Sequence, residues 1–142
     1  TEYEHRKFPG QGKISYDEGY DAKSHPEEIA VAKWLNENLG GNIKLLAESD
    51  TDGVKMPDYI WNNKYWELKS TTTEKAANSA IRKGIKQIAG NPGGIILDYK
   101  KDVDIQEVIN VIEKRINSSK ESNLSFDIMI VAKNKINAVI RY

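Results

Sequence analysis

The sequence predicts an α/β domain in which a mixed sheet is flanked by helices. Its core would follow the order helix, three strands, helix, strand, and an additional helix and a strand hairpin would complete the chain. Two observations support this fold. Segments with apolar residues at helical spacing alternate with short apolar runs, and turn-forming Gly, Pro and Asn residues separate them. Strands linked by helices favour parallel pairing, whereas strands joined by tight turns pair antiparallel.

The composition fits one domain of ordinary size. The chain has 142 residues, of which 39% are hydrophobic and 30% are charged, as in globular proteins. Its formal net charge is zero, so overall charge gives no argument for nucleic-acid binding. The absence of cysteine excludes disulfides, thiolate zinc sites and a cysteine nucleophile. No apolar run approaches the roughly 20 residues needed to span a bilayer.

Residues 1–23 read as an irregular arm, and residues 24–142 as the domain itself. The arm contains three glycines and Pro9, and it shows neither helical nor strand periodicity. Two interpretations stay open for it. It is either a linker or an arm that packs on the domain through Tyr16 and Tyr20.

The first helix is predicted from a start signal and a stop signal. Ser24 and Glu27 have the spacing of a capping box, with Ser24 as the N-cap, and Pro26 suits the first turn. Apolar residues then recur at helical spacing until Gly40-Gly41, which is expected to end the helix.

Three strands are expected next, and a tight turn joins the last two. The turn residues are Asn62 and Asn63, because asparagine tolerates positive φ better than most residues. The three expected strands cover residues 43–47, 58–61 and 65–69.

The second half of the chain repeats the alternation of helices and strands. A helix is expected over residues 74–89 and a buried strand over residues 95–99. A further helix over residues 104–118 precedes two closing strands. These strands cover residues 126–132 and 136–140 and surround a short lysine-flanked turn.

The hairpin turn determines which side chains meet across the two strands. With Asn62 and Asn63 as the turn, counting back along both strands brings Asp58 opposite Glu67. Side chains alternate along a strand, and directly paired residues share a face. Asp58, Glu67 and Lys69 are therefore predicted to converge on one side of the hairpin.

Two directly paired carboxylates repel each other, so a cation is expected beside them. Lys69 is one candidate and a divalent metal is the other. Mg²⁺ binds through few carboxylates, keeps several waters and accepts phosphate oxygens, and phosphodiester hydrolysis uses such a metal. Lys69 would then orient the attacking water or stabilise the transition state. The alternative is a surface hairpin in which Lys69 forms a simple salt bridge.

Glu28 is the fourth candidate acid. It continues the helical stripe of Ala32, Leu35 and Leu39, where an unpaired acid would be costly to bury. Glu27 already has the capping role, so Glu28 is the better site candidate. The alternative is a first-turn acid that interacts favourably with the helix dipole.

The helix expected over residues 74–89 is locally basic, and basic residues near a metal centre can hold a phosphate backbone. Hydroxyl side chains also follow Lys69 directly. The substrate-binding candidates are Ser70, Thr72, Lys83, Lys86 and Gln87. A solvated helix face and a capping segment are the alternatives for these residues.

These residues resemble two known patterns. Pro57-Asp58 followed by Glu67-Leu68-Lys69 resembles the PD-(D/E)xK nuclease motif, and the order of elements resembles the αβββαβ core of that superfamily. Residues from about 25 to 142 resemble the C-terminal nuclease (tRNase) toxin domain of bacterial contact-dependent growth inhibition proteins of the CdiA type. The helix at 81–87, the strand at 95–98 and the closing hairpin carry this second resemblance.

The resemblance implies a toxin carried at the C-terminal end of a larger exported bacterial surface protein. Such a domain would act in the cytoplasm of the target cell, cut tRNA there, and be neutralised by a cognate immunity protein in the producing cell. Asp58 and Glu67 would bind a divalent metal, Mg²⁺ or alternatively Mn²⁺ or Zn²⁺, while Lys69 would assist catalysis and Glu28 complete the acids. Two other functions stay open, a DNA endonuclease toxin with the same metal centre and a non-catalytic α/β binding module.

Overall fold

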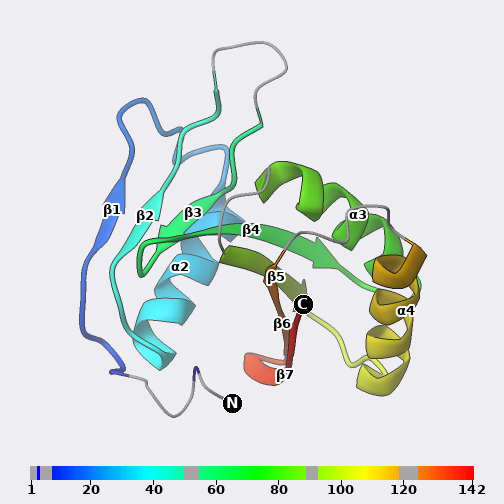
Figure 1. The fold of residues 1–142 in the computed structure, drawn as a ribbon. Helices are drawn as coiled ribbons and strands as arrows, with labels where there is room; N and C mark the ends of the chain where they lie inside the picture. The colour runs from blue at the N-terminus through cyan, green and yellow to red at the C-terminus, as the bar shows by residue number, and fades with distance from the viewer. Residues whose placement is uncertain (1–2, 4–7, 50–54, 89–92, 119–124) are drawn as a thin grey trace.

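The computed structural model describes residues 3, 8–49, 55–88, 93–118 and 125–142. Within these residues the expected order of helices and strands is confirmed, with one extra strand at the start (Figure 1). The elements are β1 (Ile14–Tyr16), α2 (Pro26–Asn38), β2 (Ile43–Leu45), β3 (Tyr59–Trp61), β4 (Lys64–Thr71), α3 (Ala77–Ile88), β5 (Gly93–Tyr99), α4 (Ile105–Ser118), β6 (Asp127–Ala132) and β7 (Lys135–Arg141).

The seven strands form one mixed sheet whose spatial order equals their order in the sequence. β4, β5 and β6 pair in parallel, because α3 and α4 return the chain to the same end of the sheet. β2, β3 and β4 pair antiparallel, as do β6 and β7, while β1 joins β2 in parallel. The prediction of a mixed α/β fold is therefore confirmed.

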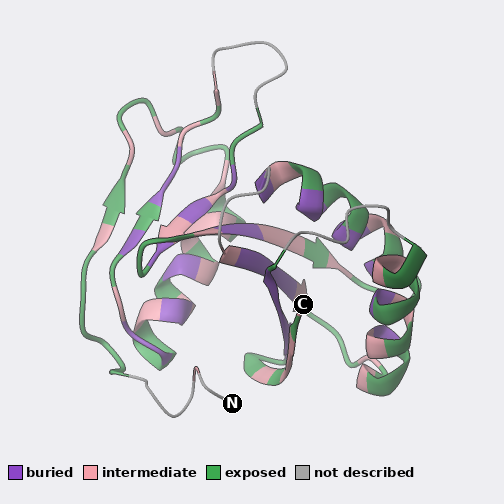
Figure 2. Cartoon of the chain, in the orientation of Figure 1, coloured by how far each residue is buried: buried purple, intermediate pink, exposed green. Residues whose placement is uncertain are grey.

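The sheet buries a separate hydrophobic core on each face. On one face, α3 and α4 pack against β5 and β6, with Ile81, Ile95 and Ile112 among the fully buried side chains. On the other face, α2 packs through Leu35 against Tyr59. Figure 2 shows the buried residues following the inward sides of the helices and the central strands. Neighbouring residues of β4 thus belong to opposite layers, which decides where the site residues point.

The hairpin between β3 and β4 has the predicted register. Asn62 and Asn63 adopt φ values of 49° and 65°, so the two-residue turn is left-handed at both positions, as asparagine allows. Trp61 pairs with Lys64, and Tyr59 pairs with Trp66. A second hairpin of the same kind joins β6 to β7, where Lys133 and Asn134 have φ values of 50° and 60°.

Two local expectations differ from the structure. The capping box is wrong: the N-cap of α2 is His25, which makes no side-chain cap bond, while the Ser24 hydroxyl donates to Asp21 at 2.5 Å. Pro26 occupies the first turn as expected, and Glu27 forms an ion pair with Lys100 at 2.6 Å instead of closing a cap. The other difference lies in the arm, where Ile14–Tyr16 form the edge strand β1.

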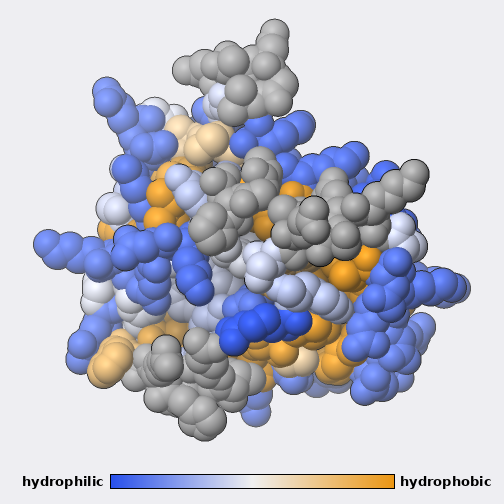
Figure 3. Space-filling model, in the orientation of Figure 1, coloured by the Kyte–Doolittle hydropathy of each residue, from blue (hydrophilic) through white to orange (hydrophobic). Residues whose placement is uncertain are grey.

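The surface is mixed in character. On the face seen in Figure 3, strongly hydrophilic residues stand around the rim, and hydrophobic residues lie between them toward the middle. Among the helices that the structure describes, none combines the length and apolar character required to cross a membrane.

Candidate active site

Asp58 lies at the point where β3 and β4 begin to separate. Its backbone N–H still donates to the Trp66 carbonyl oxygen at 3.1 Å, but the regular strand begins only at the next residue. The next hydrogen bond to β4 comes from the side chain of Asp58 instead of the backbone: its Oδ2 accepts a hydrogen bond from the Leu68 N–H at 2.8 Å. This bond holds the carboxylate of Asp58 beside the middle of β4.

Glu67 is one of two buried charged or polar side chains in the described residues, and it is only 3% exposed. Its Oε2 lies 3.2 Å from Nζ of Lys69, two residues further along the same face of β4. Its other oxygen, Oε1, is buried and receives no hydrogen bond from any described residue. A buried acceptor without a donor is unfavourable, so this oxygen calls for a proton or a cation.

The carboxyls of Asp58 and Glu67 interact directly, as the predicted register requires. Burial, and next the adjoining Asp58 carboxyl, raise the pKa of Glu67 from 4.5 to about 9, while Lys69 acts in the opposite direction. Without a metal, this upward shift favours the protonated form of Glu67, whose proton can bridge to Asp58. The predicted convergence of Asp58, Glu67 and Lys69 on one side of the hairpin is consistent with these contacts.

Glu28 approaches the same place from α2. The Tyr20 hydroxyl donates to its Oε1 at 3.1 Å, and Nδ1 of His25 lies 3.1 Å from its Oε2. Burial, and next the negative charge of Asp58, raise the pKa of Glu28. Glu28 and Asp58 both line a cleft of about 260 Å³ that also includes Tyr20 and His25. The structure thus brings Glu28 near Asp58, with its carboxylate held by two side chains.

Tyr20 and His25 also belong to this cleft, and the sequence gives no direct sign of it. The sequence indicates Tyr20 only as a packing residue of the arm, and its ring lies 5.8 Å from the ring of His25 and 5.5 Å from that of Tyr16. His25 also lies 3.8 Å from an exposed carboxylate oxygen of Glu48. The sequence signal for this packing is the presence of two tyrosines in an arm that otherwise shows no periodicity.

The carboxylates can be compared with the needs of a divalent cation. Within the described part of the chain, no group of three or more His, Cys, Asp or Glu side chains is arranged to hold a metal ion. Asp58 and Glu67 together offer two adjoining carboxyls, and one buried oxygen of Glu67 has no hydrogen-bond partner among the described residues. Mg²⁺ fits such a pair, because it binds through one or two carboxylates and completes its shell with water and phosphate oxygens.

The substrate-binding candidates lie on two sides of the sheet. Lys83 and Lys86 are exposed on α3, and Gln87 is half-buried on the same helix. Inward-facing Gly84 lets α3 lie close to β5, since an added Cβ would come 2.8 Å from Ile95. α3 therefore covers the face of β4 that carries Glu67, and Figure 1 shows β4 running beneath it.

Ser70 and Thr72 follow Lys69, and both are exposed. Because side chains alternate along β4, Ser70 points to the opposite face of the sheet from Lys69, where Leu68 packs with the α2 layer. Thr72 lies just after the end of β4. The structure brings Asp58, Glu67 and Lys69 together and Glu28 close to them, whereas Ser70 is separated from this group by the sheet.

No protein-family model matches the sequence, and no curated protein matches it. Among solved structures, this chain is similar to a chain of the CdiA-CT/CdiI toxin and immunity complex from Burkholderia pseudomallei. The two chains share 20% sequence identity with a TM-score of 0.54, and the match covers 90% of this chain and 99% of that chain. The fold described above is thus shared with that chain over nearly its whole length.

Proposed function

We propose that this chain is a metal-dependent ribonuclease toxin domain that hydrolyses phosphodiester bonds in RNA, with tRNA as its preferred substrate. The observation that carries the proposal is the buried carboxyl of Glu67, which has one unpartnered oxygen, adjoins Asp58 and lies 3.2 Å from Lys69. A buried acid with a strongly shifted pKa beside charged partners is typical of a functional site. Pro57-Asp58 and Glu67-Leu68-Lys69 then correspond to a PD-(D/E)xK core formed by α2, β2–β4, α3 and β5.

Asp58 and Glu67 are the residues that would hold the metal. A divalent cation supplies charge neutralisation at the phosphate and a more acidic bound water. Asp58 is already oriented for this role by the Leu68 N–H. Glu67 must lose its proton, and its raised pKa means that metal binding and proton release are linked.

Lys69 and Glu28 would act on the substrate side. The side chain of Lys69 is 22% exposed, so its ammonium can reach both Glu67 and a phosphate oxygen on which negative charge develops. Glu28 lines the cleft beside Asp58, and its carboxylate accepts a hydrogen bond from the Tyr20 hydroxyl. Its raised pKa suits a group that takes a proton from the attacking water.

The remaining candidates would contact the phosphate backbone of the substrate. Lys83 and Lys86 present positive charge on α3, which covers the same face as Glu67, and Gln87 lies one turn beyond Lys83. Thr72 lies just after the end of β4, whereas Ser70 points to the other face of the sheet and would contact only a part of the substrate that passes around the end of the strand. In a chain with zero net charge, binding through so few cations would be local and sensitive to salt.

The fold supports a role in a toxin system. The similar chain belongs to a complex of a toxin and an immunity protein, and that name covers both components. We assign this chain to the toxin side, because an immunity protein has no need of a buried Asp58–Glu67 pair beside a lysine. By the same reasoning its partners are RNA and a cognate immunity protein, and it would be exported as the C-terminal part of a larger surface protein and act in the target-cell cytoplasm.

The proposal is tested by incubating the purified chain with purified tRNA and with plasmid DNA, with Mg²⁺, Mn²⁺, Zn²⁺ or excess chelator. We expect tRNA to be cut in the presence of a divalent metal and to survive in chelator. Degraded DNA with intact tRNA would identify a DNA endonuclease toxin instead. If neither substrate is cut with any metal, the chain is a non-catalytic module, and an immunity protein becomes the better assignment.

Glu28→Gln is expected to lower the cleavage rate by about a hundredfold, within the usual contribution of a proton-transferring group. The amide keeps a hydrogen bond from Tyr20 and the volume of the side chain, so the thermal midpoint should change little. Glu37→Gln, an exposed position on the same helix, is the matched control and should cleave at the wild-type rate. Equal activity of both variants would remove Glu28 from the site.

A further inference from the structure

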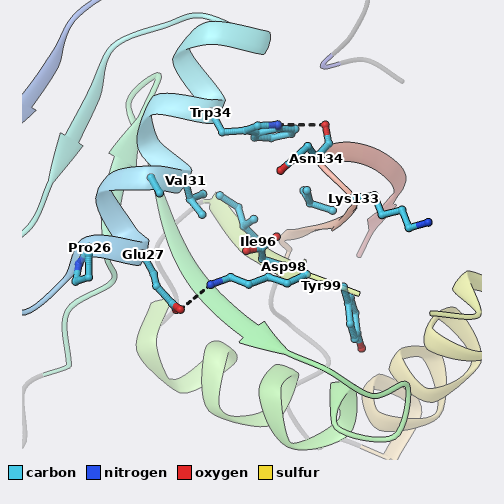
Figure 4. A pocket seen from close by; sticks show the side chains of 12 residues that line it. Pro26, Glu27, Val31, Trp34, Ile96, Asp98, Tyr99, Lys133 and Asn134 are labelled. Atoms are coloured by element: carbon cyan, nitrogen blue, oxygen red, sulfur yellow. Dashed lines mark hydrogen bonds and ion pairs between the residues drawn. The ribbon is translucent and has the colours of Figure 1, made fainter. Parts of the chain in front are cut away.

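A second cavity lies on the face of the sheet opposite Glu67 and Lys69. It has a volume of about 460 Å³ and lies between α2, the carboxyl end of β5 and the turn from β6 to β7 (Figure 4). Val31 and Trp34 of α2 and Ile96 of β5 supply apolar walls. This volume falls in the range of small-ligand sites, and the carboxyl ends of parallel strands are where α/β sheets commonly bind ligands.

Asp98 brings a carboxylate into this cavity. It is half-buried on β5, where its backbone pairs with Ser70 and Val131, and among the described residues none forms a hydrogen bond or a close ion pair with its carboxylate. Burial raises the pKa of Asp98, and Lys100 opposes this rise. A lone carboxylate next to an apolar wall is a costly arrangement, which a ligand with N–H donors would relieve.

Trp34 supplies a flat surface beside this carboxylate. Its indole Nε1 donates to the Asn134 carbonyl oxygen at 3.2 Å, which fixes the ring across the opening between α2 and the β6–β7 turn (Figure 4). The ring is half-buried, whereas Trp61 and Trp66 are 3% and 1% exposed. A fixed, accessible indole is a stacking surface for a planar ring.

Two lysines stand at the rim. Lys100 pairs with Glu27 at 2.6 Å across one end of the cavity, and Lys133 pairs with Asp102 at 2.6 Å near the other end. All four side chains are largely exposed, so these pairs are weak and can exchange for another anion. A phosphate group is such an anion, and it accepts hydrogen bonds from ammonium groups.

We propose that this cavity binds a guanine nucleotide, with the base on Trp34, its donor edge on Asp98 and its phosphate at one of the two rim lysines, Lys100 or Lys133. The inference goes beyond the nuclease centre, because it concerns a site on the other side of the sheet. It rests on the proposed function in one respect only, that a guanosine of the RNA substrate would be its natural occupant.

The donor pattern selects guanine among the four bases. An ionised carboxylate only accepts hydrogen bonds and has two oxygens side by side. Guanine places N1–H and the 2-amino group next to each other on one edge, so both oxygens of Asp98 are satisfied. Adenine and cytosine turn a ring acceptor toward the carboxylate beside their amino group, and uracil flanks its single N–H with two carbonyls. Each of these bases leaves one oxygen unpaired or facing another acceptor.

An arginine side chain also presents paired N–H donors and stacks on indole. The two rim lysines favour the nucleotide, because a phosphate can replace the exposed carboxylate of Glu27 or Asp102 as the partner of a lysine, whereas a guanidinium cannot pair with a lysine. Arginine is therefore kept as an outcome of the test.

The test is equilibrium binding of GMP to the full chain in the presence of chelator, with the quenching of tryptophan fluorescence as the binding signal. Trp34 is the accessible indole, so Trp34→Phe should remove the signal even if binding persists. Inosine monophosphate lacks the 2-amino group and should bind about tenfold more weakly than GMP, and AMP more weakly still. Equal affinities for GMP, inosine monophosphate and AMP would overturn the assignment of the base.

Asp98→Asn is the decisive variant, because it keeps the shape of the side chain and replaces one acceptor by a donor. GMP binding should weaken by at least tenfold, and the preference over inosine monophosphate should disappear. Glu37→Gln removes an exposed carboxylate of α2 that does not line the cavity and should bind GMP within about twofold of the wild type. Wild-type affinity in the Asp98 variant would contradict the proposal, as would tight binding of an arginine amide without binding of GMP.

Two binding experiments distinguish a free nucleotide from a base of an RNA as the occupant of the cavity. A short RNA with one guanosine, compared with the same RNA carrying inosine, is titrated against the Lys69→Ala variant in chelator so that it stays intact. Discrimination between these RNAs identifies the substrate as the occupant, whereas binding of GMP alone identifies a free nucleotide. Because no arm measures cleavage, GMP binding with no nuclease activity would sustain this inference while the proposed function fails.

Discussion

Lys69→Ala is expected to reduce RNA cleavage by roughly a hundred- to a thousandfold, the range for removal of one group that stabilises transition-state charge. The fold should persist, because the ammonium contacts Glu67 and its side chain is 22% exposed rather than part of either core. Circular dichroism and the thermal midpoint check the fold, and single-turnover cleavage of tRNA gives the rate. A folded variant with a rate near wild type would remove Lys69 from the chemistry.

Two comparisons make this result specific. Lys64→Ala changes an exposed lysine on the same strand and should leave the rate unchanged. A titration of Mg²⁺ then separates two roles of Lys69. If saturating metal restores the rate of the Lys69 variant, the lysine acts by keeping Glu67 ionised for the metal. If the rate stays low at saturation, the lysine acts on the reacting phosphate.

The site was predictable from the sequence where its geometry depends on local rules. The register of the hairpin follows from the Asn62-Asn63 turn, because that turn demands two left-handed residues and side chains alternate from there. One detail was not predictable. The regular strand β3 begins only after Asp58, so the side chain of Asp58, and not its backbone, accepts the hydrogen bond from the Leu68 N–H.

The failures depend on contacts that the spacing of residues does not specify. The capping box assumes that Ser24 and Glu27 cap the helix together, while in the structure Ser24 bonds Asp21, three residues earlier, and Glu27 pairs with Lys100, far along the chain. β1 has only three residues and is stabilised by its pairing with β2. It is too short for an alternating pattern to be recognised in the sequence. The cavity lined by Trp34 and Asp98 joins α2, β5 and the β6–β7 turn, segments whose meeting depends on the tertiary fold.

Glu67→Gln is expected to abolish cleavage and at the same time to stabilise the metal-free protein at alkaline pH. The pKa of Glu67 is raised by folding, so the folded state binds its proton more tightly than the unfolded state. The stability from that proton is fully present below the ordinary pKa of 4.5 and is lost as the pH rises from there toward about 9. The free energy of unfolding of the wild type should therefore fall across this window, by at most about 1.4 kcal/mol per pH unit. The glutamine cannot ionise, and its amide can donate to Asp58 in place of the shared proton, so this loss should be absent.

Thermal unfolding in chelator at pH 5 and at pH 8.5 measures this difference. The wild type should lose several degrees more than the Gln variant between the two pH values, since about 1 kcal/mol corresponds to a few degrees in a domain of this size. Glu37→Gln should follow the wild type, because it alters an exposed carboxyl instead of a buried one. Adding Mg²⁺ at pH 8.5 should raise the midpoint of the wild type and leave that of the Gln variant unchanged, since binding to the folded state stabilises it only where the ligand set is intact. If both proteins show the same pH dependence and the same response to Mg²⁺, then Glu67 neither holds the proton nor binds the metal. The paired carboxyls of the β3–β4 hairpin would in that case be a structural contact instead of a catalytic centre.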